Sequence, residues 1–193
     1  MNSKIFCLEG EWHTNDLRDQ STVETYLRFL KETFGIDYLY RKVNTREAFF
    51  KYLEQLGRYS KGRYKDYSII YLAFHGDKKK LWLDEIDAVE IDELSEIKST
   101  PLLNRIVHFG SCRTLKMNVE DLEEFWISSQ AKAVSGFSRN IDFMEASLFD
   151  IAYLHKLCSL KHTGKIFNFM NNKFKRLSND LGFVYIDKNN PKD

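Results

Sequence analysis

The chain of 193 residues has little of what marks secreted, membrane or nucleic-acid-binding proteins. Its net charge is only +1, from 29 basic and 28 acidic residues, which gives no general attraction to nucleic acid or to an anionic membrane. No apolar run approaches the roughly 20 residues that span a bilayer. The N-terminus lacks the long apolar core and the small-residue cleavage site of a signal peptide. We therefore expect a cytoplasmic protein without a membrane partner.

Cysteine and proline are also scarce. The three cysteines, Cys7, Cys112 and Cys158, are widely spaced, odd in number and include no CxxC motif, so they do not predict a disulfide framework. A zinc site would need ligands at closer spacing, and no metal or other cofactor is predicted. Only two prolines, no Gly/Ser-rich linker and a length near that of one domain favour a single α/β domain over residues 1–193. A hydrophobic content of 43% excludes disorder.

Several phosphate and hydrolase signatures are missing as well. There is no GxxxxGK[ST] or GxGxxG motif for nucleotide phosphates, and no GxSxG motif for a serine hydrolase. Two basic stretches, 58–65 and 78–80, are candidates for contact with RNA or an acidic partner. Runs of this kind usually form solvated loops, so we do not expect a nucleic-acid partner.

Hydrophobic periodicity divides the chain into alternating strands and helices. Strands are predicted at 4–8, 36–43, 68–74, 105–109, 131–137 and 183–187, and helices at 21–34, 45–56, 119–130, 143–160 and 163–180, with a short helix after Asp92 and a tight hairpin in 77–84. Ser21 and Glu24 have the spacing of a capping box. This alternation predicts an α/β fold with a mostly parallel central sheet of about six strands and helices on both faces. Functional sites in such sheets lie at the carboxyl ends of the strands.

Two strands that are apolar on both faces end in reactive residues. SIIYLAF is followed by His75 and Gly76, and RIVHF is followed by Gly110, Ser111 and Cys112. Neighbouring parallel strands lie about 4.8 Å apart, so their tips would bring His75 and Cys112 within reach of each other. Imidazole can convert a nearby thiol to the nucleophilic thiolate. The backbone N–H groups of Gly76 and Cys112 are candidates for stabilising an oxyanion.

This order of motifs resembles the caspase-like (clan CD) cysteine peptidases, which include caspases, metacaspases, legumains, gingipains, separases and bacterial CHAT-domain proteases. The segment KAVSGFS, with Gly136 and a following amphipathic helix, is most similar to the CHAT branch. The resemblance runs from the first strand to the last and implies the caspase–haemoglobinase-like fold. It further implies an endopeptidase with His75 as base, Cys112 as nucleophile, the amides of Gly76 and Cys112 as oxyanion donors, and no third catalytic side chain. The resemblance also implies a protein or peptide substrate and an activating protein partner. It assigns no role to Arg113.

The same resemblance places part of the P1 pocket in the loop after the strand that follows the Cys strand. Here that loop is SRNIDFME. Asp142 would select Lys or Arg at P1, whereas Arg139 would select Asp or Glu. We favour Asp142 and a basic P1 residue, although both charges also fit an exposed loop.

Other interpretations of the same residues stay open. A Cys after a buried strand is usually a small core residue, and a His before Gly can simply end a strand. The alternatives are a catalytically inactive caspase-like interaction or regulatory module, and a thiol hydrolase of non-peptide substrates. His108 is a second candidate base, but an extended strand places it about 13 Å from Cys112, so we interpret it as a core residue.

Overall fold

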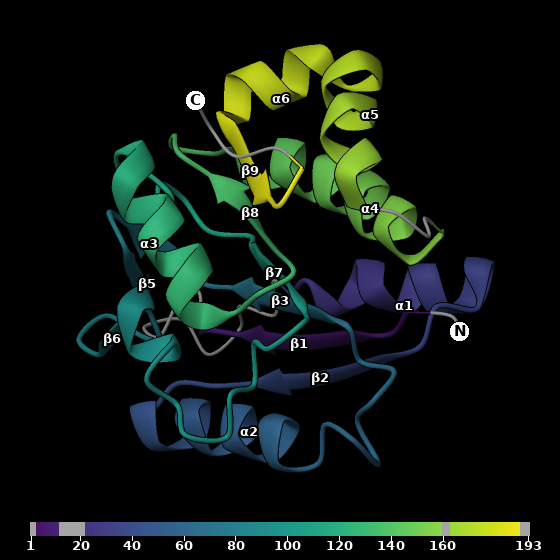
Figure 1. Ribbon diagram of the computed structural model, residues 1–193. Helices are drawn as coiled ribbons and strands as arrows, with labels where there is room; N and C mark the ends of the chain where they lie inside the picture. The colour runs from purple at the N-terminus through teal and green to yellow at the C-terminus, as the bar shows by residue number, and fades with distance from the viewer. Residues whose placement is uncertain (1–2, 12–21, 160–162, 190–193) are drawn as a thin grey trace.

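The computed structural model describes residues 3–11, 22–159 and 163–189 (Figure 1). Its centre is a six-stranded sheet with the order β2-β1-β3-β7-β8-β9. All neighbours are parallel except β9, which pairs antiparallel with β8. The strands are β1 (Ile5–Glu9), β2 (Tyr38–Lys42), β3 (Ile69–Ala73), β7 (Ile106–Phe109), β8 (Ala133–Phe137) and β9 (Phe183–Asp187). The predicted, mostly parallel sheet of about six strands is confirmed.

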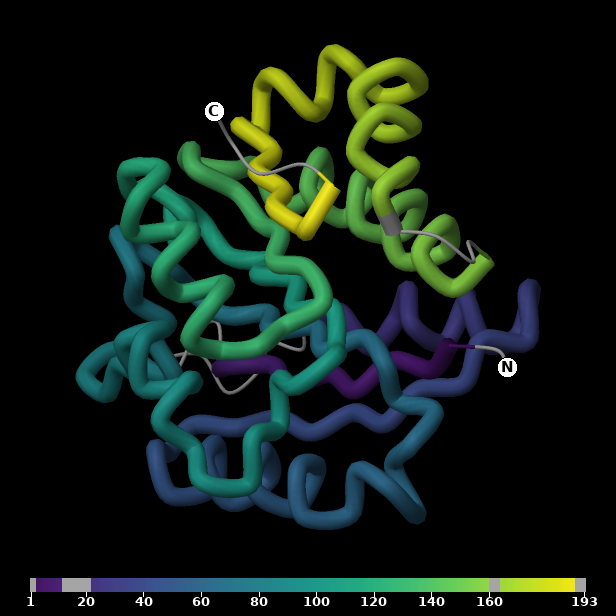
Figure 2. The backbone as a smooth tube through the Cα atoms, in the orientation of Figure 1, coloured from purple at the N-terminus to yellow at the C-terminus, as the bar shows by residue number. Residues whose placement is uncertain are grey.

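Helices cover both faces of this sheet, as predicted. Side chains from α2 (Arg46–Arg58) and α3 (Val119–Ser129) pack on one face, and those from α1 (Glu24–Phe34) and α4 (Phe143–Ser159) pack on the other. The second face is completed by η2 (Thr163–Lys165), α5 (Ile166–Lys173) and α6 (Lys175–Leu181). Figure 2 shows how this C-terminal part folds back so that β9 lies along β8.

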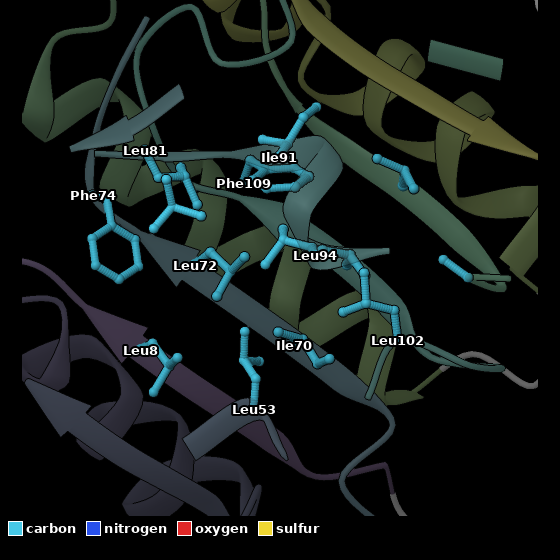
Figure 3. Close-up of a cluster of buried hydrophobic side chains, with 14 of the residues drawn as sticks. Leu8, Leu53, Ile70, Leu72, Phe74, Leu81, Ile91, Leu94, Leu102 and Phe109 are labelled. Carbon is cyan, nitrogen blue, oxygen red and sulfur yellow. The ribbon is translucent and has the colours of Figure 1, made fainter. Parts of the chain in front are cut away.

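Strand β3 illustrates how the two cores form. Ile70 and Leu72 point into the core shared with α2, whereas Tyr71 and Ala73 point into the core shared with α1 and α4. Alternation of side chains along a strand produces this division, and because both faces are covered, every residue of β3 is buried. Figure 3 shows the first core, where Leu72, Phe74 and Phe109 pack near Leu81.

The segment after β3 differs from the sequence-based prediction. His75 does not lie at the tip of the parallel strand; it begins β4 (His75–Asp77) of a second, antiparallel sheet with β5 (Lys80–Trp82) and β6 (Ala88–Glu90). The predicted hairpin is present, but the third strand was not foreseen. Lys78 and Lys79 adopt φ values of 37° and 70°, the left-handed conformation that two-residue hairpin turns require.

Two predicted helices also differ. The helix expected over 163–180 is interrupted at Phe174, where φ −121° and ψ 33° leave the helical region and start α6 in a new direction. The short helix expected after Asp92 is a single 3-10 turn, η1 (Ile91–Leu94). Ser21 lies outside the described residues; the start of α1 is held by Glu9, whose carboxylate accepts the Val23 N–H at 2.9 Å. In the described ranges, no helix has the length and apolar character to cross a membrane.

Leu72→Ala tests the role of the β3 core. Leu72 is fully buried between α2 and the sheet, so removing its side chain should lower the free energy of unfolding by about 2–5 kcal/mol. Urea denaturation measures this loss. Ile86→Ala is the control because Ile86 is 86% exposed and should change the stability by less than about 0.5 kcal/mol. Equal effects of the two substitutions would contradict the described core.

Candidate active site

The candidate site lies where β3 and β7 end side by side. Leu72 pairs with Phe109 in the parallel ladder, and the Gly110 N–H donates to the Leu72 carbonyl at 2.9 Å. His75 and Cys112 each follow three residues after this last pair. The two predicted residues therefore leave the same end of adjacent parallel strands.

Two close contacts hold together the segments that follow β3 and β7. The Ser111 hydroxyl donates to the Leu72 carbonyl and accepts the Phe74 N–H, both at 3.3 Å. Gly76 lies against the Cys segment so closely that a Cβ atom there would come within 2.6 Å of the Cys112 carbonyl oxygen and 2.1 Å of the Thr114 hydroxyl. A glycine is required at this position because any side chain would separate the β4 hairpin from the Cys112 segment.

Arg113, which had no role in the sequence-based prediction, joins the hairpin to the Cys112 segment. Its Nε lies 3.1 Å from the Asp77 carboxylate, and its carbonyl accepts the Lys78 N–H at 3.1 Å. The Lys79 N–H donates to the Thr114 carbonyl at 3.0 Å. Arg113 has a φ of 51°, so the backbone is left-handed immediately after Cys112. These bonds fix the register between the residues that follow His75 and those that follow Cys112.

His75 and Cys112 border the same pocket, which has a volume of about 260 Å³. Its wall comes from α1, the strand ends, the loop before α4 and the first turns of α4. The residues that line it are Val23, Tyr26, Tyr71, Phe74, His75, Gly110, Cys112, Ile141, Phe143, Ala146, Ser147 and Asp150. The site is therefore a mostly apolar pocket with a thiol and an imidazole at its edge.

The two side chains differ in their exposure. His75 is exposed and also borders a second pocket of about 340 Å³ with Glu11, Trp82 and Asp84. Cys112 is half-buried, and its thiol donates to the Ile141 carbonyl at 3.8 Å. The sulfur is thus accessible from the pocket while its proton is directed to the loop before α4.

Asp142 and Arg139 lie outside the pocket lining. Asp142 accepts the Glu145 N–H at 3.0 Å and so caps the start of α4. The Arg139 guanidinium donates to the Asn179 carbonyl at 3.0 Å, near the end of α6. Their neighbours Ile141 and Phe143 do reach the pocket. The roles predicted for Asp142 and Arg139 in substrate selection stay predictions, and no pocket contact of either side chain supports them.

A buried polar cluster in the pocket floor was missed by the sequence reasoning. Asp150 is 2% exposed and accepts the Tyr71 hydroxyl at 2.6 Å, while His108 Nε2 lies 2.9 Å from its other oxygen. His108 is fully buried, in agreement with its interpretation as a core residue. A signal was present in the sequence, because Asp150 interrupts the apolar stripe of α4 that Ala146, Tyr153 and Leu157 continue.

The described residues contain no group of three or more His, Cys, Asp and Glu side chains arranged to hold a metal ion. Neither Cys7 nor Cys158 has the lowered pKa that is typical of a nucleophilic cysteine. Burial, followed by the charge of Glu9, raises the pKa of Cys7 well above its usual value, and burial raises the pKa of Cys158 to about 12. Both thiols are therefore protonated at neutral pH.

Comparison with known proteins identifies the family. The model of DUF6642, described as a family of unknown function, matches residues 2–186. The chain belongs to this family. No curated protein matches it. Among solved structures, the Drosophila initiator caspase Dronc is similar over 98% of this chain and 81% of the caspase chain, with a TM-score of 0.56 and 12% sequence identity. At this identity the likeness shows the fold alone, and the fold of this DUF6642 protein is caspase-like.

Thiol alkylation tests the accessibility of Cys112. Iodoacetamide at neutral pH should label Cys112 well before Cys7 or Cys158, because Cys7 is buried and burial raises the pKa of both other thiols. Peptide mass spectrometry after timed quenching measures the three rates. Labelling of Cys158 should rise as the pH approaches its raised pKa. Faster labelling of Cys7 than of Cys112 would contradict the described burial.

Gly76→Ala tests the close approach of the hairpin to the Cys112 segment. The added methyl group overlaps the Cys112 carbonyl, so the substitution should destabilise the protein by about 1–3 kcal/mol and change the rate of Cys112 alkylation. Urea denaturation and the labelling assay measure the two effects. Gly62→Ala is the matched control, since the nearest atom that its Cβ would meet is the Tyr59 carbonyl oxygen at 4.0 Å. Unchanged stability and labelling in the Gly76 variant would show that the two segments are not in contact.

Proposed function

We propose that this DUF6642 protein is a cysteine endopeptidase in which Cys112 is the nucleophile and His75 is the general base. The observation that carries the proposal is that both side chains border one pocket, at the same end of two adjacent parallel strands. The fold also supports the proposal, because the similar solved structure is that of an initiator caspase. A partly accessible thiol with an imidazole at the same pocket has the composition of a thiol hydrolase site.

The proposed reaction uses these two side chains in turn. His75 takes the Cys112 proton, which releases the thiol from the Ile141 carbonyl, and the thiolate attacks the carbonyl carbon of the scissile bond. Protonated His75 then gives its proton to the leaving amine as the C–N bond breaks, and a thioester to Cys112 forms. A water molecule, deprotonated by His75, attacks the thioester, and the proton returns to the sulfur as the acid product leaves.

The negative oxygen of each tetrahedral intermediate needs hydrogen-bond donors. We propose the backbone N–H groups of Gly76 and Cys112 for this role. Gly76 supports the assignment because it is opposite Leu81 in the hairpin, one residue from the Asp77–Lys80 pair that closes the two-residue turn. Residues at alternate positions of such a ladder direct their N–H groups away from the partner strand. The Gly76 N–H is therefore not used by β5.

The branch of the superfamily and the location in the cell are separate proposals. The resemblance to the CHAT branch rests on KAVSGFS, but Gly136 also has a packing reason: a Cβ there would lie 2.8 Å from the Phe109 carbonyl. Membership of that branch stays a prediction. A cytoplasmic location is likewise a proposal, which the three unpaired cysteines support because thiols persist in a reducing compartment.

Peptide cleavage tests the proposed function. A fluorogenic peptide library varied at P1 should be hydrolysed by the wild-type chain, and Cys112→Ala should abolish the activity. His75→Ala should lower kcat by about three powers of ten or more and should slow alkylation of Cys112. Cys158→Ala and His155→Ala are matched controls outside the pocket and should keep both rates.

An unreactive Cys112 together with no cleavage would refute the proposal. The caspase-like interaction module without catalysis would then be the better interpretation, with the thiol retained by the Ile141 carbonyl. Rapid alkylation that depends on His75, without cleavage of any peptide, would instead favour a thiol hydrolase of non-peptide substrates.

A further inference from the structure

The floor of the pocket beside Cys112 carries a buried carboxylate. Asp150 lines the pocket from α4, and the Tyr71 hydroxyl donates to its Oδ2 at 2.6 Å. Tyr26, from α1, is hydrogen-bonded through its hydroxyl to that of Tyr71 and also lines the pocket. Three oxygen atoms from three different elements therefore gather at the inner end of the pocket.

His108 contacts Asp150 from β7. His108 Nε2 lies 2.9 Å from Asp150 Oδ1, and its Nδ1 lies 3.0 Å from the Ser135 hydroxyl. The Tyr153 hydroxyl donates to Ser135 at 2.8 Å, and the Ser135 hydroxyl donates to the Val107 carbonyl at 3.4 Å. These bonds join His108, Ser135 and Asp150 in one buried polar cluster.

Among the described residues, no Lys or Arg is paired with Asp150. None of the pocket-lining residues is Lys or Arg, and within the described part of the chain His108 is the one basic side chain paired with this carboxylate. The negative charge affects its neighbours: burial and then Asp150 raise the pKa values of Tyr26 and Tyr71 well above their usual range. A cationic group of a ligand in the pocket would interact favourably with this buried carboxylate.

The rest of the pocket suits a long side chain with an apolar stem. Val23, Phe74, Ile141, Phe143 and Ala146 add apolar surface to the lining that Cys112 and Asp150 share. Lys and Arg have such a stem and carry the charge at its end. The Tyr26 and Tyr71 oxygens can accept further hydrogen bonds from that charged group. An acidic side chain would meet Asp150 with the same charge and lose its hydration.

We propose that this pocket binds the Lys or Arg side chain of the residue whose carbonyl group Cys112 attacks, with Asp150 as the partner of its charge. Placing that side chain at P1 rests on the proposed function. The binding of a cation in the pocket does not rest on it. The sequence suggested Asp142 for the selection of a basic residue, but the Asp142 carboxylate caps α4. In this proposal Asp150 has that role instead.

A binding experiment tests the pocket without catalysis. Benzamidine and benzamide have nearly the same shape, but only benzamidine is a cation. Calorimetric titration of the Cys112→Ala protein should give benzamidine an affinity about tenfold or more above that of benzamide. Equal affinities, or no binding of benzamidine, would overturn the proposal. This result is independent of any failure to cleave peptides.

A cleavage experiment tests the position of the cation. Fluorogenic peptides that differ only in Arg or its neutral isostere citrulline at P1 should differ about ten- to hundredfold in kcat/KM, and peptides with Asp should be cut still more slowly. Asp150→Asn should reduce the Arg-to-citrulline ratio towards one. Asp142→Asn is the matched control: Asn also caps helices, and the ratio should persist.

Folding of the Asp150→Asn chain is checked by circular dichroism and urea denaturation, because the residue is buried. If that variant does not fold, the ligand pair and the Arg–citrulline pair on the chain with native Asp150 still test the proposal. Loss of the ratio in Asp142→Asn but not in Asp150→Asn would overturn it in favour of the loop carboxylate. A preference for Asp at P1 would overturn it as well.

Discussion

The parallel pairing of β3 with β7 is the interaction on which the candidate site depends. It aligns Leu72 with Phe109, so both strands end at the same level of the sheet. The residues beyond the last pair can then meet without a long loop. The Ser111 hydroxyl joins the segment after β7 to the end of β3. This register determines where the pocket, the Cys112 thiol and the His75 imidazole lie, and it allows Gly76 to pack closely. A shift of one residue would exchange the two cores, because it would reverse every side chain of the strand.

Much of this arrangement could be predicted because it is encoded in short, contiguous patterns. The runs SIIYLAF and RIVHF are apolar on both faces, and the structure buries them between two layers of helices. Parallel topology then places whatever follows them at one edge. The small sheet of β4, β5 and β6 could not be predicted in the same way. Its strands are three residues long, and its position depends on Arg113 and Thr114, which lie more than thirty residues further along the chain.

The contrast between Asp142 and Asp150 shows why a charged loop residue is a poor guide to the residues that line a pocket. Asp142 has the spacing of a helix cap with Glu145, and the structure uses it in that way. Asp150 lies in an apolar stripe where a carboxylate is unfavourable unless other elements supply donors. Those donors, Tyr71 on β3 and His108 on β7, are 79 and 42 residues away in sequence. Neither partner can be identified until the sheet order and the position of α4 are known, although the oddity of a buried-face Asp is visible in the sequence.

His75 lies in the small sheet and Cys112 follows a strand of the main sheet, and this separation has an evolutionary consequence. Cys112 follows a strand at the centre of the main core, so an insertion or deletion near it would disturb buried packing on both faces. His75 begins a short hairpin outside the main sheet, and its position depends on the close packing of Gly76 and on the bonds of Lys78 and Lys79 to the segment after Cys112. A substitution that loosens these few contacts can therefore move the imidazole and leave the main sheet intact. The position of His75 relative to Cys112 is more easily lost in sequence divergence than the strand before the cysteine.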